Sequence, residues 1–170
     1  MARITVNTTG KQPHIYLSTD TANVWDGSAA GVAAWDFLDV LCLQDLTITN
    51  STGVFSWTDF CSTDMQKITT PADNSIETNM VIEQAEFFGD GTTPVDNAPA
   101  YGVNGLSANK VYVQFVVVMD GEIDVAGKLY YNGNGYITSI APTVSPEAPV
   151  WVSPMTIAVD GPMITDTTTA

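Results

Sequence analysis

Positive charge is scarce in this chain. Only five of its 170 residues are lysine or arginine, against 19 aspartate and glutamate residues, so the formal net charge is -14. The cationic residues are scattered, at Arg3, Lys11, Lys67, Lys110 and Lys128. Because gripping DNA by its phosphates requires clustered lysine and arginine, an ordinary nucleic-acid binder is excluded. The same charge suits a passage that must not hold DNA, and it equally suits a simple need for solubility.

Cysteine and long apolar runs are scarce as well. No stretch approaches the ~20 consecutive apolar residues of a membrane-spanning helix, and residues 1–10 lack the apolar segment of a secretory signal. We therefore expect synthesis in the cytoplasm and no membrane partner. Cys42 and Cys61 have no metal-ligand spacing, so we expect two buried free thiols, with a disulfide between them as the alternative.

The usual signatures of catalysis are missing. A hydrolase needs a nucleophile beside a base, which is most often histidine, and the only histidine, His14, lies near a terminus with no G-x-S-x-G motif elsewhere. There is no G-x-x-x-x-G-K-S/T phosphate loop and no G-x-G-x-x-G after a strand. We predict that the protein is not an enzyme and that it takes no cofactor and no metal.

Short β-prone runs separated by Gly, Asn, Asp and Pro dominate the chain from residue 38 onward, which is typical of a sandwich or barrel. Residues 110–119 and 122–131 flank Asp120-Gly121, a pair that favours a tight type I′ hairpin turn. A second turn at residues 132–135 would lead into a third strand at 136–144. The pattern predicts a meander of three antiparallel strands.

Upstream of this meander, residues 40–49 and 54–60 predict a strand pair joined by a turn at residues 50–53. Residues 75–88 predict another strand. The polar stretch between residues 61 and 75, which contains Pro71, predicts an exposed loop.

Helix candidates are few. Residues 28–41 are rich in alanine but interrupted by Gly31, so helix and extended chain are both open there. Residues 98–106 are a candidate short helix that Asp96-Asn97 would cap.

The C-terminal part of the chain is rich in proline, at Pro146, Pro149, Pro154 and Pro162. Proline confines extended segments to edge strands or arms. We therefore predict one mainly β domain over residues 1–170, an antiparallel β-sandwich or partial barrel with at most one or two short helices and a long hairpin loop. Its parts would be an N-terminal arm (1–14), a core (15–152) and a C-terminal arm (153–170).

Acidic and aromatic residues raise further possibilities. Asp120, Glu122 and Asp124 alternate along a predicted strand, which would place them on one face. Such a face could bind calcium, could hold the two carboxylates of a glycosidase, or is simply solvated, and we favour the last. The four tryptophans stand far apart, at Trp25, Trp35, Trp57 and Trp151. We expect them in the core or in subunit interfaces rather than in a sugar-binding platform.

Three stretches of the chain, taken in order, resemble the major tail tube proteins of long-tailed, siphovirus-type bacteriophages. The first contains Trp35, Phe37-Leu38, Val40, Q-D-L-T-I at 44–48 and W-T-D-F-C-S at 57–62. The second is S-I-E-T-N-M-V-I-E at 75–83. The third is residues 127–140, with G-N-G-Y-I-T-S-I at 133–140, followed by V-D-G-P at 159–162. Together they cover about residues 35–162.

The resemblance implies a structural virion protein. Its copies would form hexameric rings with a shared β-barrel lumen, and the rings would stack into a tail tube through which DNA is ejected without specific binding. It implies tape-measure, tail terminator and distal tail proteins as further partners, and a place in the virion tail after assembly in the bacterial cytoplasm. Within that tube, Asp120, Glu122 and Asp124 become candidates for an acidic lumen lining. The residues of the long hairpin loop become candidates for contact with an adjacent ring, namely Asp64, Gln66, Lys67 and Asp73.

Two other interpretations fit the same composition. An acidic, β-rich chain without catalytic motifs would also suit a capsid decoration or cement protein, which binds a preformed shell. A carbohydrate-binding or calcium-binding surface module would instead use the aromatic and acidic side chains.

Overall fold

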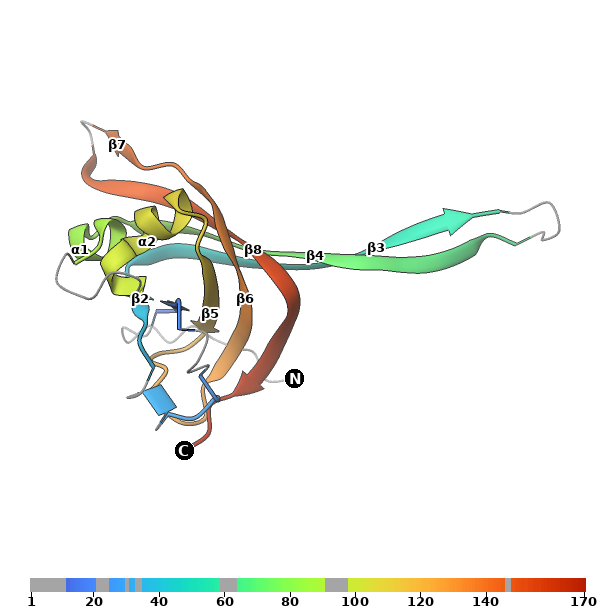
Figure 1. Ribbon diagram of the computed structural model, residues 1–170, viewed down its shortest axis with the longest axis horizontal. Coiled ribbons are helices and arrows are strands. Elements are labelled where there is room, and N and C mark those ends of the chain that lie inside the picture. Colours follow the sequence, from blue (N-terminus) through green and yellow to red (C-terminus); the bar gives the residue numbers. More distant parts are fainter. Residues whose placement is uncertain are drawn as a thin grey trace.

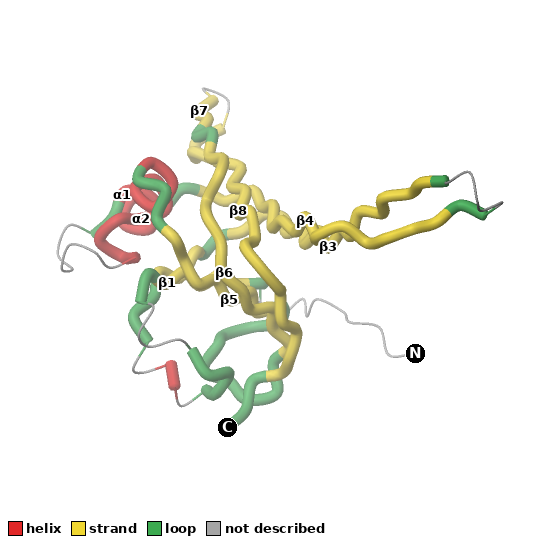
Figure 2. The backbone as a smooth tube through the Cα atoms, turned by 45° about the vertical axis from the view of Figure 1, so that its right-hand side comes forward, coloured by secondary structure: helices red, strands yellow, loops and turns green. Residues whose placement is uncertain are grey.

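One antiparallel sheet organises the chain (Figure 1). The computed structural model describes residues 12–20, 25–29, 31–32, 35–58, 64–90, 98–145 and 148–170. The strands in these residues are β1 (His14–Ser18), β2 (Leu38–Val40), β3 (Leu43–Trp57), β4 (Gln66–Val81), β5 (Tyr112–Val118), β6 (Leu129–Ile140), β7 (Thr143–Ser145) and β8 (Ala148–Thr167). Their order is β2-β1-β5-β6-β8-β4-β3, with β7 paired to β8. The mainly β prediction is confirmed, and the sheet is curved and open, with β2 and β3 at its edges (Figure 2).

Strand β5 is buried on both of its faces. Val113, Phe115 and Val117 point into a first core that contains Phe87 and Leu106 of the helices. Val116 and Val118 point the other way, into a second core with Trp25, Trp35, Ile123 and Tyr130. The near-continuous apolar run Y-V-Q-F-V-V-V is the pattern expected when both faces of a strand are covered.

Two short helices, α1 (Gln84–Phe88) and α2 (Ala98–Ala108), cover the first core. The expected helix at residues 98–106 is confirmed, with a kink at Gly102, whose backbone is not helical, while Asp96-Asn97 lies outside the described residues. The helices pass so closely that a Cβ on Gly102, which has a φ of +60°, would lie 2.7 Å from the Phe87 carbonyl oxygen. The strand expected over residues 75–88 is correct only to Val81, because the chain turns into α1 three residues later.

The predicted three-stranded meander is wrong, because β6 runs straight through the expected turn at residues 132–135. The glycines there serve close packing between strands. A Cβ at Gly133 would lie 2.7 Å from the ring of Phe115, and one at Gly135 would overlap the backbone carbonyl of Ala158 in β8. The tight turn at Asp120-Gly121 is also wrong, since residues 119–128 form a longer connection between β5 and β6.

The predicted turn at residues 50–53 is wrong as well, and the loop predicted between 61 and 75 is wrong from residue 66 onward, where strand β4 begins. Strands β3 and β4 pair from Leu43↔Met80 out to Trp57↔Gln66. At one point Gly53 of β3 faces both Thr70 and Pro71 of β4. A bulge of this kind accepts proline, which has no N–H to contribute to the ladder.

Strand β8 corrects the assignment of residues 153–170 to a C-terminal arm, because it lies between β6 and β4 inside the sheet. Pro162 sits in a bulge, between the pairs Asn132↔Ile164 and Asn134↔Asp160. The pairing between β6 and β8 ends at Ile140↔Met155, so Pro154, the residue before Met155, has no partner in β6. Of the alanine-rich stretch at 28–41, residues 38–40 form strand β2. The N-terminal arm expected at residues 1–14 lies outside the described residues up to position 11.

We expect Gly135→Ala to lower the free energy of unfolding by about 1–3 kcal/mol, the usual cost of forcing extra volume into a packed site. Asn134→Ala, at the exposed neighbouring position of the same strand, is the control and should change it by less than about 0.5 kcal/mol. Urea unfolding followed by circular dichroism measures both variants. Equal losses would mean that β6 and β8 do not approach as closely as described.

Candidate functional site

The side of the sheet that carries the second core is only half covered. The segment before β2 and the connection between β5 and β6 pack over the β1–β5 half of this side, near the C-terminal end of the molecule (Figure 2). Tyr112 and Gln114 alternate with Val113 in β5 and so share this side with Val116. Their cross-strand partners extend the same side onto β6, β8, β4 and β3, where no described segment lies over them.

Cross-strand pairing defines this uncovered surface, which we call the open face. One row of paired residues comprises Tyr112, Tyr136, Ala158, Ser75 and Thr49. Neighbouring rows contain Gln114, Asn134 and Asp160 on one side, and Thr47, Glu77 and Thr156, then Asp45, Asn79 and Pro154, on the other. Most of these residues are polar and are exposed or half-buried.

The open face is acidic. It carries the carboxylates of Asp45, Glu77 and Asp160, and none of its residues is lysine or arginine. Asp45 is held in place by the backbone N–H and the side-chain amide of Asn79, which donate to its two oxygens at 2.7 and 2.6 Å. Burial, and then the charge of Asp160, raise the pKa of Tyr112 beside it. Among the described residues, no three His, Cys, Asp or Glu side chains are placed to share a metal ion.

The predicted acidic trio lies in the connection between β5 and β6, so the strand alternation that grouped it is wrong. Ile123 is buried in the second core, and its N–H donates to the hydroxyl of Tyr16 at 3.4 Å. Glu122 and Asp124 on either side of it are exposed, whereas Asp120 is half-buried and its carboxylate lies 3.7 Å from Lys128 Nζ. The connection therefore packs on the same side of the sheet as the open face.

Strands β3 and β4 extend beyond the body as a two-stranded ribbon (Figure 1). We call residues 49–57 and 66–73 the distal hairpin, and every one of them is exposed. The residues expected in an inter-ring loop are all exposed here too. Gln66, Lys67 and Asp73 lie on strand β4 rather than in a loop, and Asp64 lies just before that strand.

The distal hairpin has one apolar face. Phe55 pairs with Ile68, and Trp57 lies two residues beyond Phe55, so the three side chains share a face. The rings of Phe55 and Trp57 stack with centroids 5.9 Å apart, and the three side chains are 58%, 41% and 56% exposed for Phe55, Trp57 and Ile68. A two-stranded ribbon is only marginally stable in water by itself. An exposed apolar face on such a ribbon makes it a candidate interaction surface.

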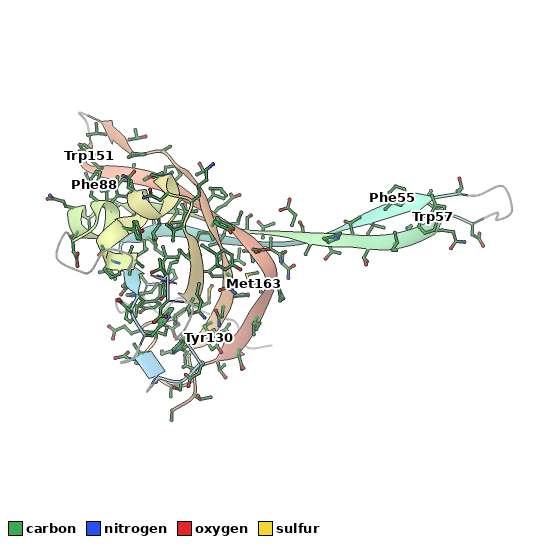
Figure 3. The ribbon with its side chains drawn as sticks, in the orientation of Figure 1. Phe55, Trp57, Phe88, Tyr130, Trp151 and Met163 are labelled. Carbon is green, nitrogen blue, oxygen red and sulfur yellow. The ribbon has the colours of Figure 1, made fainter. Side chains whose placement is uncertain are left out.

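Two of the four tryptophans are buried and two are exposed. Trp25 and Trp35 stack in the second core with their ring centroids 6.2 Å apart, as predicted for core residues. Trp57 and Trp151 are exposed at opposite ends of the molecule (Figure 3). Cys42 is also exposed, with a free thiol, which corrects the expectation that it is buried; Cys61 lies outside the described residues.

A pairing that sequence reasoning missed lies at the β1–β2 edge of the sheet. His14 Nδ1 is 3.2 Å from a carboxylate oxygen of Asp39. That hydrogen bond raises the pKa of His14 against the opposing effect of burial, and the charges of Asp39, Glu122 and Glu86 add to the rise. No sequence signal links two residues 25 positions apart, because only the short edge strand β2 brings them together.

No protein-family model and no curated protein matches the chain, but its fold resembles solved structures. A chain from the tail of an empty gene transfer agent particle, solved with C6 symmetry, has a TM-score of 0.55 at 14% identity, covering 89% of this chain and 95% of that one. A chain of the sheath–tube complex of an extracellular contractile injection system in the extended state has a TM-score of 0.55 at 10% identity, with coverages of 96% and 93%. A chain from the sheath/tube terminator of such a system in the extended state has a TM-score of 0.56 at 10% identity, covering 98% of this chain and 99% of that one. These likenesses establish the fold. No described helix is long and apolar enough to cross a membrane.

The His14–Asp39 pair predicts a specific pH dependence of stability. The folded-state pKa of His14 is raised above its ordinary 6.5, so the stabilisation is complete below about pH 6.5 and is lost as the pH rises through the folded-state pKa. Between pH 6 and 8 the free energy of unfolding should therefore fall in the wild type relative to His14→Gln, by at most about 1 kcal/mol because the pair is partly exposed. Asp39→Asn should likewise reduce the change in the free energy of unfolding over this pH range. If His14→Gln shows the same fall in the free energy of unfolding between pH 6 and 8 as the wild type, the pH dependence comes from other groups. Glu86, whose pKa is raised by burial, would be one of them.

Proposed function

We propose that this chain is a structural subunit that assembles into stacked hexameric rings and so forms a phage-type tail tube. The observation that carries this function is the fold likeness over nearly the whole chain to proteins of tails and of extended sheath–tube assemblies. These particles include contractile systems, so the fold supports the tail tube class in general rather than the siphovirus type alone. The role is structural rather than catalytic.

The open sheet supports self-assembly. Strands β2 and β3 end the sheet, and a free strand edge presents unpaired N–H and C=O groups that invite pairing with another chain. β3 is long, with 15 residues. Pairing between the edges of neighbouring copies would satisfy these groups and would close the ring, because one contact repeated head to tail generates a closed cycle when its rotation permits.

The open face is the surface that we place toward the channel of the tube. The helices lie on the opposite side of the sheet, over the first core, so the open face is free to line a shared lumen. Its carboxylates Asp45, Glu77 and Asp160 would give the wall a negative potential without any cation to bind a phosphate. Glu122 and Asp124, on the same side of the sheet, would add to that lining, as would Asp120, whose charge is partly offset by Lys128. Genomic DNA would then pass without specific binding.

The distal hairpin would reach the adjacent ring through contact residues that include Gln66, Lys67 and Asp73, together with Asp64 just before strand β4. A tube of this kind belongs to a virion tail assembled in the host cytoplasm. Its further partners would be a tape-measure protein inside the tube and terminator and distal tail proteins at its ends.

Assembly should depend on ionic strength. Six copies bring six times the -14 formal charge of one chain into each ring, and added salt shortens the range of that repulsion to about 10 Å at 0.1 M. Negative-stain electron microscopy of the purified protein across a salt series should reveal rings or tubes above a threshold concentration. A stable monomer at every salt concentration would overturn the proposed function.

The placement of the open face has its own test. Glu77→Gln removes one charge per copy from the open face, so six like charges would leave one channel and the salt threshold for assembly should fall. Glu83→Gln is the matched control, because Glu83 is also an exposed glutamate but stands at the start of α1, beside the first core. Light scattering against salt concentration gives both thresholds. A shift no larger for Glu77→Gln than for Glu83→Gln would contradict a channel position for this face.

A further inference from the structure

A second exposed apolar surface lies at the end of the body opposite the distal hairpin. Phe88 at the end of α1 and Trp151 in β8 are 52% and 50% exposed. Both stand at this end, far from Phe55 and Trp57 (Figure 3). Val144 of β7, the strand that pairs with this part of β8, is 58% exposed. We call Phe88, Trp151 and Val144 the corner patch.

The two aromatic residues of the corner patch belong to the same side of the sheet. Trp151 alternates in β8 with Ser153 and Met155, both of which are buried, and Met155 is part of the first core. The carbonyl of Trp151 accepts the N–H of Ile82 at 2.9 Å, immediately before α1 begins. Helix α1 packs on the first core through Phe87, leaving Phe88 outward with its ring 5.0 Å from that of Phe87. The corner patch is therefore built on rigid, buried supports.

We propose that the apolar face of the distal hairpin in one copy docks on the corner patch of a second copy. This docking mode presupposes the ring assembly proposed above and names the surface that receives the hairpin. Both surfaces are apolar and exposed, and they lie at opposite ends of the molecule, so they cannot meet within a single copy. Trp and Phe side chains at both surfaces are the residue types that anchor protein interfaces. Burial by a second copy also removes the instability of a solvated two-stranded ribbon.

Site-directed cross-linking tests the docking. In a background with Cys42→Ser and Cys61→Ser, one preparation carries Ile68→Cys on the apolar face of the hairpin and a second carries Trp151→Cys. The two are mixed under assembling salt and treated with a short bis-maleimide, and the linked pair is identified by mass spectrometry. Val54→Cys replaces Ile68→Cys in the control, because Val54 is 57% exposed against 56% for Ile68 but lies on the other face of the ribbon.

We expect several-fold more linked pair from Ile68→Cys than from Val54→Cys. Rings or tubes with no linked pair, or with equal amounts from both variants, would overturn this docking mode and would place the hairpin elsewhere on its neighbour, while leaving the proposed function standing. A linked pair without rings at any salt would support the docking but would overturn the hexameric tube. Failure of both assembly and cross-linking would overturn both.

Discussion

The pairing of β8 with two strands at once holds this molecule together. Along one edge β8 pairs with β6, from Leu129↔Thr167 to Ile140↔Met155, and along the other it pairs with β4, from Ser75↔Ala158 to Val81↔Val152. The β3–β4 ribbon joins the rest of the sheet only through this strand in the sheet order. Gly135 permits the close approach that β6 and β8 require. The long ribbon is therefore a continuation of the core rather than an appendage.

Unequal coverage of the sheet follows from this arrangement. Near β5 both sides are buried, by helices on one side and by aromatic-rich connections on the other. Toward β3 the covering segments are absent among the described residues, and the apolar side chains give way to Thr, Ser, Asn and carboxylates. The two halves of the sheet therefore differ in how far they are buried. One half is buried on both sides, while the other half leaves polar and apolar side chains exposed, and these are the surfaces that the proposed assembly would bury.

The sequence was informative where a pattern reports burial directly. The apolar run of β5 and the helix at residues 98–106 were predicted correctly, because both depend on local composition. Glycine and proline led to wrong predictions of turns where pairing with a distant strand keeps the backbone extended. Gly133 and Gly135 leave room for Phe115 and for the β8 backbone, and Pro71 and Pro162 occupy bulges. A single sequence does not reveal such neighbours, since they are brought together by the pairing of strands far apart in the chain.

The candidate surfaces were foreseen to a similar degree. The hairpin residues Asp64, Gln66, Lys67 and Asp73 were assigned to the correct projecting region although its strands were taken for a loop. The open-face carboxylates were missed, because Asp45, Glu77 and Asp160 share a side only through the register of β3, β4 and β8. That continuity of β3 and β4 has a mechanical consequence. Eight residues of β4 carry the ribbon about 26 Å past the body at ~3.3 Å per residue. A pull on the tip would load the β4–β8 hydrogen bonds in shear, all at once, so a tube built from such subunits would resist stretching without any hinge to yield first.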